Sequence, residues 1–374
     1  MYSCRSEVSQ DSIIFQQKIE LNKIDSVFFD LDTLSTSRNN SSQVISFNGE
    51  SYFSFLNKKN NSIYFYSLNS GKLVKKFTFP LNGIDGVGKI SHYFLGSFDS
   101  VFLYSYGAAK LSLVDSTGEV ISNYNIEGDY QAVRPEVNSS RPIFKVKSLL
   151  GFNSWGSEKE YYNNDKFPEK YFMFLDVHQG EKKYFISYPD VYKGAIWGVQ
   201  FYQFYHDVNY KDNKLVLSFP IDNDLTIFDL ETYKTYKVNS NLKKNLQVKP
   251  LSYRKGKIVP ELTEEVKHQM RQDYYSLIKY DSVNSIYARV VNKRFDENYI
   301  SSFSGLNSIF GDYSIIFLNS EFQFIGQIDD LKNRYYITSM FFLNGKLYLE
   351  QLQNYNEDIL VFDIFDINFL SEKK

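Results

Sequence analysis

The sequence has few cysteines, tryptophans, glycines and prolines. Its 374 residues include one Cys, two Trp, 19 Gly and eight Pro. A single cysteine, Cys4, cannot form an internal disulfide or supply the ligands of a zinc cluster. Glycine and proline occur less often than in average proteins, which excludes collagen-like and low-complexity chains.

The sequence also lacks an excess of charge of one sign and lacks long apolar runs. The 42 basic and 44 acidic residues give a formal charge of -2. No bulk electrostatic field therefore attracts nucleic acid or an anionic membrane, and we expect no nucleic-acid partner. The longest uninterrupted apolar run, 171–175, is far shorter than the roughly 20 residues of a membrane-spanning helix.

Tyrosine and phenylalanine are abundant instead, with 31 and 33 residues. Aromatic side chains suit pleated, half-buried surfaces and favour β-strands. Three apolar or alternating segments at 51–56, 62–68 and 72–79 are separated by short turns rich in Asn, Ser and Gly, and a similar triplet spans 100–124. This pattern predicts antiparallel β-hairpins that recur along the chain.

The repeat predicts a β-propeller. Further copies occur at 215–238, 314–328 and 346–365, and corresponding turns begin near residues 69, 115, 229 and 319. These separations fit a unit of about 45 to 57 residues, which is the size of one propeller blade. We therefore predict an all-β chain with six four-stranded antiparallel blades. The segment 13–21 could complete the blade that begins near 336 and so close the ring.

Two segments interrupt the repeat. Residues 126–168 contain Pro135 and Pro142 and are expected to form long loops around the third blade. Residues 260–274 have the pattern of one short amphipathic helix on the propeller surface. The predicted organisation is a polar N-terminal tether at 1–10 followed by a single propeller domain at 11–374.

Several motifs carry a family resemblance. They are a Pro/Gly-rich segment at 79–90 that leads into a strand, the blade turn 69–71, Tyr280-Asp281, and Tyr287-Ala-Arg289. In this order, and over about residues 40–370, the chain resembles an uncharacterised Bacteroidetes family of six-bladed β-propeller lipoproteins. The resemblance implies an exported propeller that faces the periplasm or outer membrane, with unknown activity and no catalytic residues to transfer.

Cys4 has two interpretations. It resembles the lipid-modified cysteine of a bacterial lipoprotein, followed by a short polar tether, and membrane attachment would then occur only through this anchor. Alternatively, it is an incidental residue of a frayed terminus. The hydrophobic signal segment that would precede a lipidated cysteine is absent from the sequence, so export would require a longer precursor.

A second pattern bears on export. Tripeptides of Asp, Ser or Thr, and an aliphatic residue begin at Asp11, Asp25, Asp32, Asp99 and Asp281. They look like the O-glycosylation acceptor of exported Bacteroidetes proteins. Asp-Ser is also a favoured turn dipeptide, so turn formation is the alternative explanation.

Signatures of metal, cofactor and nucleophilic chemistry are absent from the sequence. The four histidines form no H-E-x-x-H motif, so we expect no metal site. Gly83, Gly86 and Gly88 have the wrong spacing for a dinucleotide loop and precede a strand, which predicts an inter-blade loop. No G-x-S-x-G motif occurs, and we expect no cofactor.

Six residues are candidates for ligand binding. Tyr280, Asp281, Tyr287 and Arg289 place an arginine among aromatic rings and an acid, which can bind a carboxylate or a sugar, or form a packed inter-blade ion pair. Trp155 and Trp197 are each followed by glycine. They can stack on a sugar or a partner, or pack inside a blade.

These observations predict a non-catalytic module, a monomer, that binds an envelope protein or a glycan on one propeller face. The alternative is a polysaccharide hydrolase or lyase with carboxylates at the mouth of the central channel. Two acids within about 10 Å of each other in a central cleft would favour hydrolysis. A lining of mixed aromatic and amide groups would favour binding.

Overall fold

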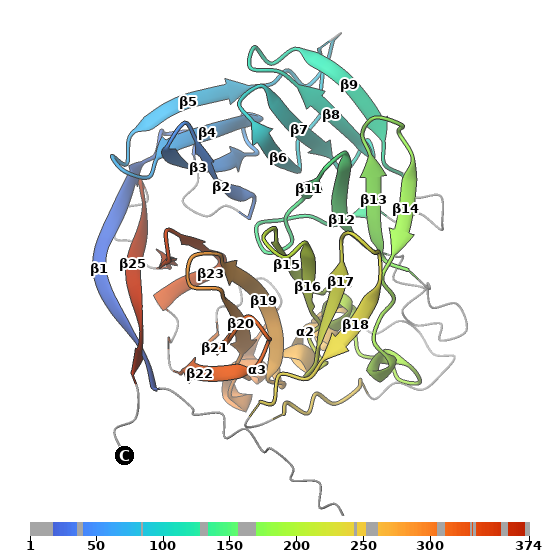
Figure 1. The fold of residues 1–374 in the computed structure, drawn as a ribbon, viewed down its shortest axis with the longest axis vertical. Coiled ribbons are helices and arrows are strands. Elements are labelled where there is room, and N and C mark those ends of the chain that lie inside the picture. Colours follow the sequence, from blue (N-terminus) through green and yellow to red (C-terminus); the bar gives the residue numbers. More distant parts are fainter. Residues whose placement is uncertain are drawn as a thin grey trace, which may run out of the picture.

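The structure, a computed structural model, describes residues 18–35, 40–83, 85–127, 134–155, 170–242, 245–251, 261–304, 311–329, 331, 334–352 and 358–370. Six antiparallel sheets form a ring around a common axis, as predicted (Figure 1). Five sheets have four strands, and the third has two short segments in place of one inner strand. The chain is thus a six-bladed β-propeller.

The strands of blades 1 and 2 follow the sequence repeat closely, whereas blade 3 departs from it. Blade 1 contains β2 (Ser42–Phe47), β3 (Glu50–Asn57), β4 (Ser62–Ser67) and β5 (Leu73–Thr78). Blade 2 contains β6 (His92–Ser97), β7 (Ser100–Ser105), β8 (Lys110–Val114) and β9 (Val120–Asn125). Blade 3 contains β10 (Arg134–Pro135), β11 (Phe144–Val146), β12 (Leu149–Trp155), β13 (Phe172–Asp176) and β14 (Lys182–Phe185).

The last three blades complete the ring. Blade 4 contains β15 (Tyr205–Asn209), β16 (Lys214–Ser218), β17 (Leu225–Asp229) and β18 (Thr235–Val238). Blade 5 contains β19 (Tyr274–Asp281), β20 (Ile286–Asn292), β21 (Tyr313–Leu318) and β22 (Phe324–Ile328). Blade 6 contains β23 (Tyr335–Leu343), β24 (Lys346–Gln351), β25 (Ile359–Leu370) and β1 (Lys18–Asp30).

The two ends of the chain meet in blade 6 and close the ring. β1 pairs antiparallel with β25, from Lys18 opposite Leu370 to Asp30 opposite Ile359. The prediction that an N-terminal strand completes the last blade is confirmed. The strand runs later than expected, from residue 18 to 30, and residues 1–17, including Cys4, lie outside the described residues.

The segment 126–168 contains strand structure where loops were expected. β10 and β11 both pair with β12, so together they take the place of the inner strand of blade 3. Between them lies a turn at Asn138–Arg141, followed by Pro142. Proline has no N–H to donate to a ladder, and Pro135 and Pro142 therefore break this strand into two pieces.

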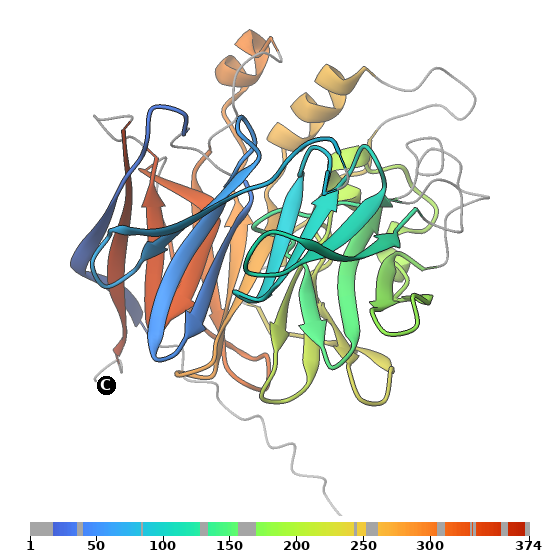
Figure 2. The ribbon, with the colours of Figure 1, turned by 90° about the horizontal axis from the view of Figure 1, so that it is seen from above.

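The helices lie on one side of the ring (Figure 2). The predicted surface helix is α2 (Leu262–Met270). A second helix, α3 (Glu297–Ser302), was not predicted. Its N-cap is Asp296, whose carboxylate accepts a hydrogen bond from the Tyr299 N–H at 3.0 Å. Met270 of α2 and Ile300 of α3 are buried in one small apolar cluster. Among the described residues, no helix has the length and apolar character needed to cross a bilayer.

Aromatic rings fill the space between blades, which explains their abundance. Phe29 of β1 lies 5.3 Å from the rings of both Phe53 and Tyr66 in blade 1, and 6.1 Å from that of Phe362 in blade 6. Large rings with few rotatable bonds bury much apolar area at low entropic cost. The junction between the first and last blades is therefore a continuous apolar core.

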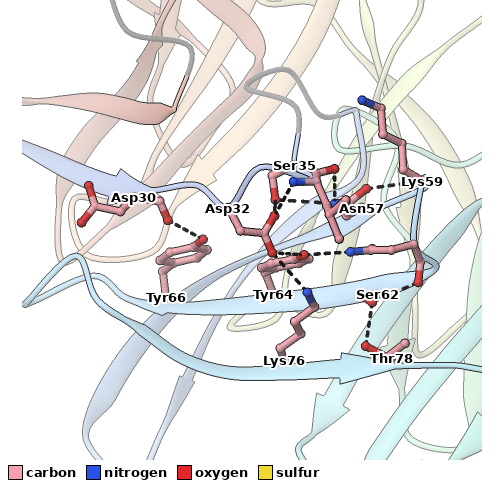
Figure 3. A network of polar contacts seen from close by, with 12 residues as sticks. Asp30, Asp32, Ser35, Asn57, Lys59, Ser62, Tyr64, Tyr66, Lys76 and Thr78 are labelled. Carbon is pink, nitrogen blue, oxygen red and sulfur yellow. Dashed lines mark hydrogen bonds and ion pairs between the residues drawn. The ribbon is translucent and has the colours of Figure 1, made fainter.

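A polar cluster also joins these two blades (Figure 3). We call Asp32, Ser35, Tyr64 and Lys76 the clasp. Asp32 follows β1 and accepts hydrogen bonds from Tyr64 Oη at 2.6 Å, Ser35 Oγ at 2.7 Å and Lys76 Nζ at 3.1 Å. Partial burial opposes ionisation, but these hydrogen bonds and the lysine charge lower the pKa of Asp32 to about 2. The clasp fastens the chain after β1 to strands β4 and β5 of blade 1.

Candidate functional site

A cavity of about 630 Å³ lies at the centre of the ring, and we call it the central cavity. Every blade contributes to its wall, mostly from the innermost strand. One lining residue from each blade, in order, is Gln43, Phe94, Ser139, Asp207, Lys279 and Phe341. Because the inner strands of a propeller converge on its axis, residues far apart in sequence become neighbours here.

Asp207 of β15 and Lys279 of β19 bring charges of opposite sign to this wall. Asp207 accepts hydrogen bonds from the backbone N–H of Tyr280 at 2.7 Å and of Val208 at 3.0 Å. Lys279 Nζ lies 3.4 Å from the backbone carbonyl oxygen of Ser139. Burial raises the pKa of Asp207, although the charge of Lys279 and the two N–H groups oppose this effect. Asp207 therefore ties blade 4 to blade 5.

His206, next to Asp207, is a neutral imidazole. It is fully buried, and its Nε2–H donates to the carbonyl oxygen of Pro142 at 2.9 Å. The rings of Phe144 and Phe172 lie edge-on to it at 5.7 and 5.2 Å. Burial lowers its pKa to about 3. Within the described ranges, no three Asp, Glu, His or Cys side chains gather as a metal site would require.

A second cavity of about 620 Å³ adjoins the first between blades 4 and 5, and we call it the side cavity. Lys211 and Tyr280 line both cavities. Lys214 and Glu321 add charges of both signs to the side cavity. Lys211 and Lys279 bring two positive charges to the central cavity, whereas Asp207 is the one carboxylate among its described lining residues. The described wall is therefore net positive.

Among the predicted ligand-binding residues whose side chains the structure describes, Tyr280 is the one that lines the central cavity. Its ring centroid lies 4.7 Å from that of Tyr287, the residue opposite it in the β19–β20 ladder. Tyr287 is fully buried, and its hydroxyl accepts a hydrogen bond from Asn209 Nδ2 at 2.8 Å. Tyr287 thus supports the position of Tyr280 from behind.

Arg289 is fully buried between blades 4 and 5. Its guanidinium donates to Ser218 Oγ at 2.9 Å and to the carbonyl oxygens of Asn223 at 2.9 Å and Asp222 at 2.7 Å. It also lies 3.6 Å from the ring centroid of Tyr275. Burial lowers the pKa of Arg289 to about 10. The geometry favours the inter-blade alternative, with carbonyl and hydroxyl oxygens in place of a paired carboxylate.

Asp281 stabilises the turn after β19. Its side chain is buried and accepts hydrogen bonds from the Val283 N–H at 3.0 Å and from Asn284 Nδ2 at 2.7 Å. Asp32 accepts the N–H of Leu34 in the same way at 3.1 Å. These Asx turns support the turn interpretation of the Asp-Ser/Thr tripeptides. Thr33 and Ser282 are exposed.

Trp197 is not among the lining residues of the central cavity. Trp197 is buried, with its ring centroid 6.2 Å from that of Tyr192, and its Nε1 has no hydrogen-bond partner among the described residues. Trp155 is the last residue of β12, and its backbone lies opposite that of Arg134 in the β10–β12 ladder. The glycine cluster at 83–88 lies between β5 and β6, which confirms the predicted inter-blade loop.

Sequence reasoning missed Asp207, Lys211 and Lys279. Lys279 directly precedes Tyr280, a predicted site residue, and this adjacency in the sequence was the one available signal. The alternation of side chains along β19 does not show which of them face the axis, because the strand contains a register irregularity between Tyr275 and Ile278. Such a bulge changes which side chains face the axis.

The ring of six blades and its mixed aromatic and polar central cavity define a β-propeller with a lined axial site. Residues 18–328 match the family model described as "Domain of unknown function (DUF4221)". The chain belongs to this family, which confirms the resemblance at the level of family and fold.

Two solved structures share the fold. A DUF4221 member from Bacteroides vulgatus is 21% identical, with a TM-score of 0.80 over 95% of this chain and 99% of that one. A Bacteroides fragilis protein, named as a candidate for export, is 12% identical with a TM-score of 0.53, over 99% of this chain and 98% of that one. The comparison with curated proteins finds no match.

Proposed function

We propose that this protein is a non-catalytic binding module whose central cavity holds a small organic anion. The observation that carries the proposal is the wall of this cavity, where Lys211 and Lys279 face one carboxylate, Asp207, among apolar and hydroxyl groups. Ligand sites are typically cavities of 300–1,000 Å³ with an apolar lining and a few polar groups that fix orientation. An anion with an apolar body matches both features.

Binding is better supported than glycoside hydrolysis. That reaction uses two carboxyl groups, one on each side of the scissile bond. Among the described residues of the central cavity, Asp207 is the one carboxylate, and its two oxygens accept backbone N–H groups. The arrangement therefore offers no acid and base pair.

We place the module at the cell envelope, exported and anchored through a lipid on Cys4, as a monomer that meets an envelope protein or a glycan. Support comes from the family resemblance and from the fold neighbour named as a candidate for export. Metabolic labelling with a radioactive fatty acid, of this chain expressed behind a lipoprotein signal peptide, tests the anchor. Label that persists in a Cys4→Ser variant would contradict it.

Isothermal titration with succinate, citrate, benzoate and inorganic phosphate tests the anion site. The decisive variant is Lys279→Met, which removes the charge at similar length. We expect at least one carboxylate to bind, and Lys279→Met to weaken it tenfold or more because a charge-assisted hydrogen bond is lost.

The matched control is Lys183→Met, since Lys183 is an exposed β14 lysine outside both cavities. It should bind like the parent protein. Absence of binding by all four anions, or equal loss in both variants, would contradict the proposed function.

A further inference from the structure

A third cavity, of about 210 Å³, lies at the opposite ends of the inner strands. Tyr205, Tyr274 and Tyr335 line it, and they are the first residues of β15, β19 and β23. The central cavity instead takes later residues of these strands, such as Asp207, Tyr280 and Phe341. The two cavities therefore occupy successive levels along the propeller axis.

Tyrosines dominate this third cavity, which we call the tyrosine cavity. Five of its lining residues are Tyr205, Tyr274, Tyr313, Tyr335 and Tyr336. Aromatic neighbours hold two of these rings: Phe201 lies edge-on to Tyr274 at 5.5 Å, and Phe365 edge-on to Tyr335 at 5.8 Å. These two rings are therefore held in position before any ligand arrives.

The remaining polar groups are uncharged hydroxyls and amides. Asn292 Nδ2 donates to Ser276 Oγ at 2.6 Å, and both residues line the cavity. No Lys, Arg, Asp or Glu occurs among its described lining residues. An ionic ligand would find no countercharge in this wall and would lose its hydration on entry.

Tyr274 offers a hydroxyl group to a ligand in this cavity. The residue is half-buried and lines the cavity, and its hydroxyl has no hydrogen-bond partner among the described residues. A half-buried hydroxyl without a protein partner is completed by water or by a ligand.

We infer that the tyrosine cavity is a second binding site, separate from the anion site, and that it takes one neutral sugar ring. The C–H faces of a sugar pack on aromatic rings, and its hydroxyl groups exchange hydrogen bonds with phenols, hydroxyls and amides. Tyr274 and the Ser276–Asn292 pair supply such groups at the wall. The inference goes beyond the proposed function, because it needs neither Lys279 nor Asp207.

Saturation-transfer NMR tests this site with glucose, galactose, mannose, fucose and N-acetylglucosamine, each at 10 mM. The decisive variant is Tyr274→Phe, which deletes one hydroxyl and leaves the ring. We expect at least one sugar to bind, and Tyr274→Phe to weaken it roughly fivefold to tenfold, as the loss of one hydrogen bond predicts. Without sugar, the thermal midpoint of Tyr274→Phe should stay near that of the parent, since this hydroxyl has no hydrogen-bond partner among the described residues.

Tyr233→Phe is the matched control, because Tyr233 is exposed and lines none of the three cavities. It should leave sugar binding unchanged, and Lys279→Met should also leave it unchanged, which separates failure here from failure of the anion site. No saturation transfer to any of the five sugars would overturn the inference. So would transfer that Tyr274→Phe does not reduce.

Discussion

The two ends of the propeller axis differ in chemistry although the same strands build both. β15, β19 and β23 begin at the tyrosine cavity with Tyr205, Tyr274 and Tyr335. The later residues of β15 and β19 bring Asp207 and Lys279 to the central cavity. One end thus carries uncharged phenols and amides, and the other carries charges of both signs.

This difference teaches that blade repetition determines the scaffold but not the sites. Corresponding strands of different blades share apolar character where the blades pack against each other, as the third strands β4, β17 and β21 do. At the axis, each blade contributes a different residue, so the site arises from six unequal positions. Function on this fold therefore resides in the axial side chains.

The largest expected effect is a loss of stability when Arg289 is replaced. It tests whether the contact between blades 4 and 5 holds the residues at both ends of the axis in place. Arg289 bridges these blades from a fully buried position and lines none of the three cavities. Arg289→Met would leave the carbonyls of Asp222 and Asn223 without their donor, and should destabilise the fold by about 3–5 kcal/mol. Urea unfolding followed by circular dichroism measures this change.

Arg271→Met is the control for this measurement. Arg271 pairs with Glu297 on the surface, so its loss should change stability by less than about 1 kcal/mol. If Arg289→Met proved as stable as Arg271→Met, Arg289 would not stabilise the contact between blades 4 and 5 that holds the residues of both cavities in place.

The outline of the blades was predictable because each blade encodes itself locally. Residues 62–68 form a mainly apolar run between turn residues, and the structure has β4 at Ser62–Ser67. Local patterning failed in blade 3, where Pro135 and Pro142 gave an inner strand the appearance of a loop. It also failed for α3, whose six residues are too few to show a helical period.

The candidate site was much less predictable than the fold. Tyr280 was identified from its place beside Asp281 and Arg289, yet these two neighbours serve a turn and a blade interface. Which residues face the axis depends on register, and both β19 and β23 contain irregularities that shift it. The tyrosine cavity combines single residues from separate blades, and no local pattern marks such a set.

A smaller effect is expected at the clasp, which lines neither end. Asp32→Asn should leave binding of both anion and sugar intact while lowering stability at neutral pH. The pKa of Asp32 lies near 2 in the folded chain, below its unfolded value of about 4. Its stabilising contribution is therefore complete above pH 4 and is lost as the pH falls from about 4 to 2. Because Asp32 is partly exposed, solvent screening reduces the contribution to about 1 kcal/mol.

Thermal unfolding between pH 7 and pH 2 measures the clasp. The parent and Asp32→Asn should differ at pH 7 and converge near pH 2. Asp99→Asn is the matched control, since Asp99 is an exposed residue in the same tripeptide pattern. A constant difference across this pH range would show that the carboxylate charge of Asp32 is not what stabilises the junction.

The smallest effect separates the two ends by salt alone. Raising sodium chloride from 50 to 500 mM should weaken carboxylate binding about twofold to fivefold, because mobile ions screen the attraction between Lys279 or Lys211 and the ligand. Sugar binding should stay constant, since no charged side chain lines the described wall of the tyrosine cavity. Titration of each ligand at both salt concentrations gives the two slopes. Equal salt dependence would mean that one site binds both ligands, and the distinction between the two ends would then have to be abandoned.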